Sequence, residues 1–342
     1  MEHAMITSRS LRIILAFIGL IAINTASAQK LTPALAGTIG QPTGRIAFIR
    51  DKSVWIMDAL GSGQMRVCQV QNADGRLSWA PDGRRIAFTR SGDVNFRSPD
   101  GAGGGMHKVY DVFVAFIDSA EVGNTFWWNR LSDGLGSRDP EWSADGSSIL
   151  FWKDMNANLV NTTYPNYQIC TMTPQGSDVQ LLRKDWQNMT EFLTFPTMNA
   201  AGDIAFELMI NLKRNGGIAV LPKTRFMVSL DSIEAKAAKM KGFVAPSWSP
   251  DGKWLACIGT DMAKQGVFIT TPQLSPVYLV FEPPAGVSMR SEAPSFSPDS
   301  KWLTFATDDE AVWICDITGN GAKRLTSPGA GKTPAWSKSL RK

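Results

Sequence analysis

One pattern of apolar and polar positions recurs along the chain and predicts its secondary structure. In each copy an aromatic residue is followed by Ser or Ala, a Pro-Asp-Gly-like turn, two variable residues and an apolar run. Four copies span residues 77–89, 140–152, 246–258 and 294–306. A fifth copy, starting at Pro196, has Met198 at the aromatic position and is one residue shorter. A sixth is divided between the two ends of the chain, at residues 333–340 and 44–59.

The pattern predicts antiparallel strands. The segment Ser249-Pro250-Asp251-Gly252 fits a type I turn, because Pro is preset for the second position and Gly tolerates the left-handed conformation that ends it. The strand after the turn is apolar on both faces, which indicates a sheet that is covered on both sides. Third strands are expected at residues 54–58, 109–118, 167–172, 267–271 and 312–316, and fourth strands end near residues 130–132, 182–184 and 324–326. Each repeat is therefore expected to form a four-stranded sheet.

Six positions carry the aromatic residue or its substitute. They are Trp79, Trp142, Met198, Trp248, Phe296 and Trp336. The divided copy suits a ring, because pairing the C-terminal strand with the N-terminal sheet leaves no open edge. We predict an all-β, six-bladed β-propeller over residues 44–342, closed by a C-terminal strand that completes the N-terminal blade. The alternative is a β-sandwich in which similar turns recur by coincidence.

These repeats resemble those of the TolB-like propeller family, whose WD-like signature is W-S-P-D-G-x-x-[IL]-[AT]-F. The same repeat occurs in the propeller domains of prolyl oligopeptidase relatives. The resemblance covers about residues 44–338. It departs from TolB in that only residues 29–43 stand where an α/β domain would precede the propeller, and from the peptidases in that no GxSxG occurs. It implies a lone propeller in the cell envelope or medium, and it leaves membership of a Tol–Pal-type assembly open.

The first 28 residues have the composition of a signal peptide. Arg9 and Arg12 precede an apolar stretch at residues 13–23, and Ala26-Ser27-Ala28 fits a cleavage site. We therefore predict a signal peptide at 1–28, a linker at 29–43 and a periplasmic or secreted protein, with an uncleaved anchor as the alternative. No later segment is apolar enough for a membrane span. The four cysteines (Cys68, Cys170, Cys257 and Cys315) lie in separate predicted blades, so we expect buried thiols rather than disulfides.

Charge and histidine content narrow the classes of function. The net charge is +4, which is too small and too dispersed to predict nucleic acid as a partner. Outside the predicted signal peptide the only histidine is His107, so zinc sites that need two imidazoles are excluded. His107 falls in a glycine-rich segment, residues 91–109, which we expect to be a surface loop rather than a catalytic set.

The candidate binding residues are carboxylates in the turns after the second strands, together with two tryptophans. They are Asp51, Asp93, Asp154, Asp261, Asp308, Trp127 and Trp128. If these turns surround one mouth of the channel, the carboxylates can attract a basic partner segment or a cation such as calcium. The alternatives are that Asp is simply a preferred turn residue and that the tryptophans pack on outer strands. Asp251 and its equivalents (Asp82, Asp145 and Asp299) are expected to be turn residues only.

The sequence carries a complete scaffold and almost no catalytic residues. We expect an exported, non-catalytic, monomeric propeller that needs no cofactor and binds a protein or peptide partner. The first alternative is a polysaccharide-active enzyme, a glycosidase or lyase, that uses paired carboxylates and exposed Trp. The second is a sensor of a small ligand or metal.

Overall fold

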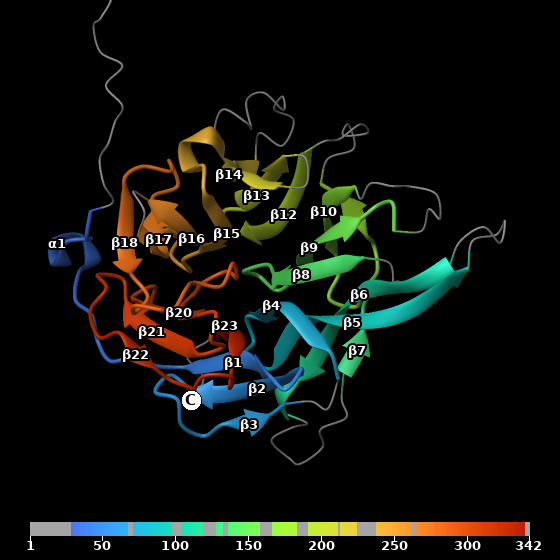
Figure 1. Cartoon of the computed structure of the whole chain (residues 1–342), viewed down its shortest axis with the longest axis horizontal. Coiled ribbons are helices and arrows are strands. Elements are labelled where there is room, and N and C mark those ends of the chain that lie inside the picture. The colour runs from blue at the N-terminus through green and yellow to red at the C-terminus, as the bar shows by residue number, and fades with distance from the viewer. Residues whose placement is uncertain are drawn as a thin grey trace, which may run out of the picture.

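The structure is a computed structural model that describes most of the chain. The described residues are 29–67, 71–97, 104–118, 128–132, 136–157, 166–182, 191–210, 213–223, 237–261 and 264–338. They form six antiparallel sheets arranged in a ring, which confirms the predicted six-bladed propeller (Figure 1). We number the blades 1 to 6 along the chain. The predicted signal peptide, residues 1–28, lies outside the described residues.

The first three blades each have four described strands. Blade 1 consists of β23 (Lys332–Trp336), β1 (Arg45–Arg50), β2 (Ser53–Asp58) and β3 (Met65–Arg66). Blade 2 consists of β4 (Ala73–Trp79), β5 (Arg85–Arg97), β6 (Gly104–Phe116) and β7 (Trp128–Arg130). Blade 3 consists of β8 (Ser137–Trp142), β9 (Ile149–Asp154), β10 (Tyr167–Met172) and β11 (Gln180–Leu181).

The other three blades follow in chain order. Blade 4 has three strands among the described residues, β12 (Glu191–Met198), β13 (Ile204–Ile210) and β14 (Lys213–Leu221). Blade 5 consists of β15 (Phe243–Trp248), β16 (Leu255–Asp261), β17 (Lys264–Thr270) and β18 (Val277–Phe281). Blade 6 consists of β19 (Ser295–Phe296), β20 (Trp302–Ala306), β21 (Val312–Asp316) and β22 (Lys323–Arg324).

The ring closes as the divided repeat predicts. Strand β23 pairs antiparallel with β1, with Trp336 opposite Ile46 and Ala335 opposite Ala47. The C-terminal strand therefore becomes the innermost strand of the N-terminal blade. The aromatic positions Trp79, Trp142 and Trp336 are almost fully buried, and apolar clusters fill the spaces between neighbouring blades. The fold is thus held by face-to-face packing of sheets that are apolar on both sides.

The Pro-Asp-Gly turns have the expected structure. The N–H of Gly252 donates to the carbonyl of Ser249 at 2.9 Å, and Gly252 has a φ of 68°. The carboxylate of Asp251 accepts from Ser249 Oγ at 2.7 Å and from the N–H of Lys253 at 3.1 Å. The equivalent carboxylates accept from backbone N–H groups in the same way; they belong to Asp82, Asp145 and Asp299. These aspartates build turns, as the sequence predicts.

Two segments, predicted from the sequence as a linker and a surface loop, have more regular structure than expected. Residues 29–43 pack on blades 5 and 6: they include the short helix α1 (Pro33–Ala36), and the indole of Trp302 donates to the carbonyl of Gly40 at 3.0 Å. The glycine-rich segment is largely strand rather than loop, because β5 and β6 stay paired from Arg90 opposite Asp111 out to Arg97 opposite Gly104. The β-branched and aromatic residues between the glycines favour this hairpin, which projects from the ring (Figure 1).

Three further details complete the fold. A 3₁₀ helix, η2 (Ala238–Met240), precedes blade 5. Three of the four cysteines (Cys170, Cys257 and Cys315) are buried and outside any disulfide, as predicted, and Cys68 lies outside the described residues. None of the helices in the described part of the chain is long and apolar enough to cross a membrane.

Candidate functional site

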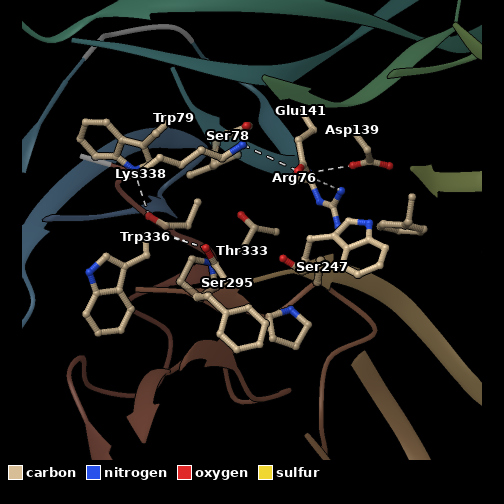
Figure 2. A pocket seen from close by; sticks show the side chains of 18 of the residues that line it. Arg76, Ser78, Trp79, Asp139, Glu141, Ser247, Ser295, Thr333, Trp336 and Lys338 are labelled. Carbon is tan, nitrogen blue, oxygen red and sulfur yellow. Dashed lines mark hydrogen bonds and ion pairs between the residues drawn. The ribbon is translucent and has the colours of Figure 1, made fainter. Parts of the chain in front are cut away.

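A cavity of about 360 Å³ occupies the central channel. The inner strands of all six blades contribute to its wall (Figure 2). The wall also includes exposed turn residues that follow the inner strands of blades 3, 4 and 5, namely Ala144, Ala200 and Pro250. The cavity therefore reaches the face of the ring that carries the Pro-Asp-Gly turns. We call this end of the cavity the channel mouth.

Four of the inner strands contain the same irregularity. In blades 1, 3, 4 and 5, two residues of the inner strand lie opposite one residue of the next strand, which is a β-bulge. The first residue of each bulge has a positive φ and the second is Pro. These first residues are Thr333, Asp139, Phe195 and Ala245, with φ between 47° and 52°. The repeat therefore carries an X-Pro pair at the channel wall.

Blade 2 departs from this rule. Asp74 pairs with Thr89 and Leu77 pairs with Phe88, so two residues of β4 are accommodated between neighbouring partners. The inner strand of blade 2 thus has one residue more than the others, with Leu77 at the position of Pro. Gly75 has a φ of 66°, and a Cβ there would collide with the carboxylate of Asp139. The additional residue is Arg76.

Arg76 sends its side chain across the channel. Its guanidinium forms an ion pair with Glu141 of blade 3 at 2.8 Å and donates to the carbonyl of Pro196 of blade 4 at 2.7 Å. It also donates to the carbonyl of Pro246 of blade 5. Its backbone N–H donates to Asp139 at 2.7 Å. One residue of blade 2 therefore connects three other blades, and its side chain is only 8% exposed.

Glu141 is a second departure from the repeat. The residue before the aromatic position is usually a hydroxyl residue that accepts the N–H of the next blade's aromatic position. Ser78 accepts from Trp142 at 3.0 Å, and Ser295 accepts from Trp336 at 2.9 Å. In blade 3 this position is Glu141, which accepts from Arg76 and from the hydroxyl of Thr197, the equivalent residue of blade 4. The two residues that break the repeat therefore meet in space (Figure 2).

Several other charged groups along the wall are also engaged. Asp139 accepts from the indole of Trp152 at 2.8 Å, and the guanidinium of Arg138 lies 3.9 Å from the ring centre of Tyr110. In blade 6, Glu292 accepts from Arg290 at 2.7 Å and from the N–H of Thr333 at 2.8 Å. Burial raises the pKa of Glu292 above its ordinary value, although Arg290 opposes the change. These carboxylates are held by neighbours rather than presented freely.

Three polar atoms at the wall lack such partners. Within the described part of the chain, Trp248 Nε1, Thr333 Oγ1 and Arg138 Nε are buried without a hydrogen bond, and their residues line the cavity. Buried donors in folded proteins are almost always paired. All three atoms are enclosed by the protein itself, so they are unpaired groups within the wall.

None of the five aspartates predicted as binding residues lines this cavity. Asp51 is an exposed turn residue between β1 and β2, and Asp93 lies within β5 opposite Lys108. Asp154 accepts the N–H of Asn156 at 3.0 Å and the N–H of Asn166 at 2.8 Å. Asp261 ends β16, and Asp308 accepts the N–H of Ser288 at 3.0 Å.

The rest of the predicted site is not tested by the structure. Trp128 begins β7, but its side chain and all of Trp127 lie outside the described residues. Among the residues that are described, no group of three or more His, Cys, Asp or Glu could hold a metal ion. The acidic ring and its calcium ion stay a prediction. Reasoning from turn residues missed Arg76 and Glu141, although Leu77 in place of Pro is visible in the repeat.

Comparison with solved structures agrees with the fold. TolB from Acinetobacter baumannii superposes with a TM-score of 0.62 at 19% identity, over 89% of this chain and 69% of that one. A candidate TolB from Agrobacterium tumefaciens superposes with a TM-score of 0.55 at 14% identity, over 86% of this chain and 92% of that one. An oligogalacturonate lyase from Vibrio parahaemolyticus gives 0.49 at 11% identity, over 82% of this chain and 79% of that one.

No family model matches the chain, and no curated protein matches it in sequence. At identities below 20%, the likeness to the two TolB structures shows a shared propeller fold. It leaves the activity of this chain open.

Proposed function

We propose that this chain is an exported, non-catalytic propeller that binds an extended segment of a protein partner in its central channel. The observation that carries the proposal is the cavity itself, about 360 Å³ in volume and reaching one face of the ring. That volume falls within the range of ligand-binding pockets, which is about 300–1,000 Å³. It suits a few side chains of a partner rather than a whole domain. In this proposal the rest of the partner covers the channel mouth.

The chemistry of the wall supports binding over catalysis. A glycosidase needs two carboxylic groups that face the substrate, one of which gives or takes a proton. Here Asp139, Glu141 and Glu292 are each held by a cation or by backbone and indole N–H groups. Carboxylates fixed in this way position neighbouring blades.

The location of the protein belongs to the same proposal. The signal-peptide pattern at residues 1–28 and the likeness to TolB structures support a periplasmic or secreted protein. Partner candidates are then proteins of the cell envelope or medium.

Site-specific photo-crosslinking tests the proposal. A photoreactive amino acid is placed at Ala144 or Ala200 on the channel mouth, and at the exposed outer residue Val179 as the matched control. We expect a discrete protein adduct from both mouth positions and none from Val179 after irradiation of cells that export the variants. Adducts of equal yield from all three positions would contradict the proposal. So would cleavage of a polysaccharide by the purified protein, which would favour the enzyme.

A further inference from the structure

The end of the described chain places a lysine in the channel. After β23, the N–H of Ser337 donates to the carbonyl of Arg45 at 2.8 Å. The next residue, Lys338, then directs its side chain away from its own blade and toward blade 3. Its ammonium donates to the carbonyl of Trp142 at 2.8 Å. It lies 3.7 Å from Glu141 Oε1 (Figure 2). Lys338 is part of the cavity wall.

The groups that receive this ammonium are hydrogen-bond acceptors. One is the backbone carbonyl of Trp142, and the other is the carboxylate of Glu141. The second carboxylate oxygen of Glu141 is bound to Arg76, and Oε1 itself also accepts from Thr197 Oγ1 at 2.9 Å. A guanidinium prefers to bind both oxygens of a carboxylate at once, whereas an ammonium is a point charge that binds single acceptors. The arrangement therefore suits a lysine better than an arginine.

The ammonium of Lys338 has fewer hydrogen-bond partners among the described residues than it has donors. An ammonium has three donors, and within the described chain its partners are one carbonyl and one carboxylate at ion-pair distance. Burial lowers the pKa of Lys338 below its ordinary value; Glu141 opposes this change and Arg76 reinforces it. Its side chain remains 30% exposed to the cavity. A second ammonium that reaches the same acceptors from the channel mouth can therefore replace it.

We propose that Trp142 and Glu141 form a receptor for a lysine side chain, that Lys338 fills this receptor in the free protein, and that a partner's lysine displaces it. The inference rests on the proposed function, because it names the chemistry of the channel's occupant. Lys338 then acts as an internal competitor that keeps the receptor closed to segments without a lysine. The partner segment is an extended peptide with a lysine at the point that enters deepest.

Chemical rescue tests the receptor without any partner. The variant Lys338→Ala removes the three methylenes and the ammonium that n-propylammonium can restore. We expect millimolar n-propylammonium to raise the melting temperature of K338A relative to wild type at equal ionic strength, because a ligand of the folded state stabilises it. Neutral n-propanol should not do so. In K338A/E141Q the response to n-propylammonium should disappear. An equal response to n-propanol, or an unchanged response in K338A/E141Q, would overturn the receptor.

A peptide measurement tests the displacement. The probes are a fluorescein-labelled Gly-Gly-Lys-Gly-Gly peptide with blocked ends and the same peptide with norleucine. Because a tethered competitor is removed, we expect K338A to bind the lysine peptide about tenfold more tightly than wild type, as measured by fluorescence anisotropy. The norleucine peptide should show no such gain. If K338A does not fold, Lys338→Ser serves as the second variant for both measurements. Equal gains for the two peptides would overturn the proposal.

The two proposals can fail separately. Rescue by n-propylammonium together with failed crosslinking at the channel mouth would keep the lysine receptor and contradict the partner-binding function. Crosslinking at the channel mouth together with failed rescue would support the partner-binding function and overturn the lysine receptor.

Discussion

The inner strand of blade 2 and the inner strands of blades 1, 3, 4 and 5 face the same channel but are built differently. The four regular strands place an X-Pro pair in a two-against-one bulge, and Pro cannot donate a backbone hydrogen bond there. Blade 2 carries Gly75, Arg76 and Leu77 in the same region, which is one residue more. In blades 4 and 5 the prolyl carbonyls, those of Pro196 and Pro246, accept from Arg76.

The comparison identifies residues at the channel wall that depart from the repeat and are not needed to build the ring. A repeat that builds a ring needs only equivalent wall residues. Arg76 is an additional residue, Glu141 replaces the residue that the other blades carry, and the two bind each other. Lys338, which follows the last strand, reaches the same carboxylate. Departures from a local rule that compensate one another in space are expected at functional or strained sites.

Removing Arg76 is expected to have the largest effect. In Arg76→Met the carboxylate of Glu141 loses its closest cation, and the carbonyls of Pro196 and Pro246 lose their donor. Breaking one side of a buried ion pair typically costs about 3–5 kcal/mol. We expect a loss of that size in the free energy of unfolding, measured by urea titration. Arg84→Met is the control, since Arg84 is half exposed and pairs with Asp118 at 3.4 Å.

A double variant separates the charge from the packing. If the ion pair accounts for the effect, R76M/E141Q should recover part of the loss, because no uncompensated carboxylate remains in the channel. A double variant less stable than R76M by the full cost of a second, independent mutation would contradict the pairing of the two residues.

Substitution of Gly75 is expected to have a smaller and more local effect on stability. Its φ of 66° already disfavours a side chain, and a Cβ would collide with Asp139 and crowd Thr89. Strain together with overpacking is expected to cost about 2–4 kcal/mol in Gly75→Ala. Gly63→Ala is a matched control, because Gly63 has a φ of 63° and no atom within 4 Å of the added Cβ. G63A should lose about 1 kcal/mol. Equal losses in thermal unfolding would mean that the contact with blade 3 is unimportant.

The sequence predicts the architecture well because each repeat contains its own turn chemistry. Ser249-Pro250-Asp251-Gly252 specifies a turn, and the apolar run after it specifies a strand covered on both faces. The divided copy also predicts that the C-terminal strand joins the N-terminal blade, and in the structure Trp336 lies opposite Ile46. These features are local, so they can be read along the chain without knowing what lies across the ring.

The channel site is harder to predict because its residues are distant in sequence. Arg76, Glu141 and Lys338 become neighbours only when the ring closes. The aspartates chosen instead are conspicuous in the sequence, but none lines the cavity, and the carboxylate of Asp154 accepts the N–H groups of Asn156 and Asn166. The useful signal was a departure from the pattern: Leu77 where the other blades have Pro, and Glu141 where they have Ser, Thr or Ala.

The smallest expected effect is at the junction of blade 6 and blade 1, where Glu292 lies. Its inner strand β19 has only two residues, and the carboxylate of Glu292 binds the N–H of Thr333 in blade 1 across the gap. Burial raises the pKa of Glu292 in the folded protein above its unfolded value of about 4.5. The folded state therefore holds the proton of Glu292 more tightly than the unfolded state does. The resulting contribution to the free energy of unfolding is fully present below pH about 4.5 and is lost as the pH rises through the folded pKa.

Glu292→Gln removes this titration while keeping the shape of the side chain. We expect the stability of E292Q relative to wild type to increase as the pH rises above about 4.5, and to level off once Glu292 is ionised in both states. Urea unfolding between pH 4 and pH 8 measures this difference. Glu282→Gln, at an exposed carboxylate paired with Lys264, is the control for loss of a surface ion pair. A difference that falls with rising pH would show that the carboxylate is stabilised at the blade 6–blade 1 junction, and a flat difference would show that burial does not raise the pKa of Glu292; either result contradicts the prediction.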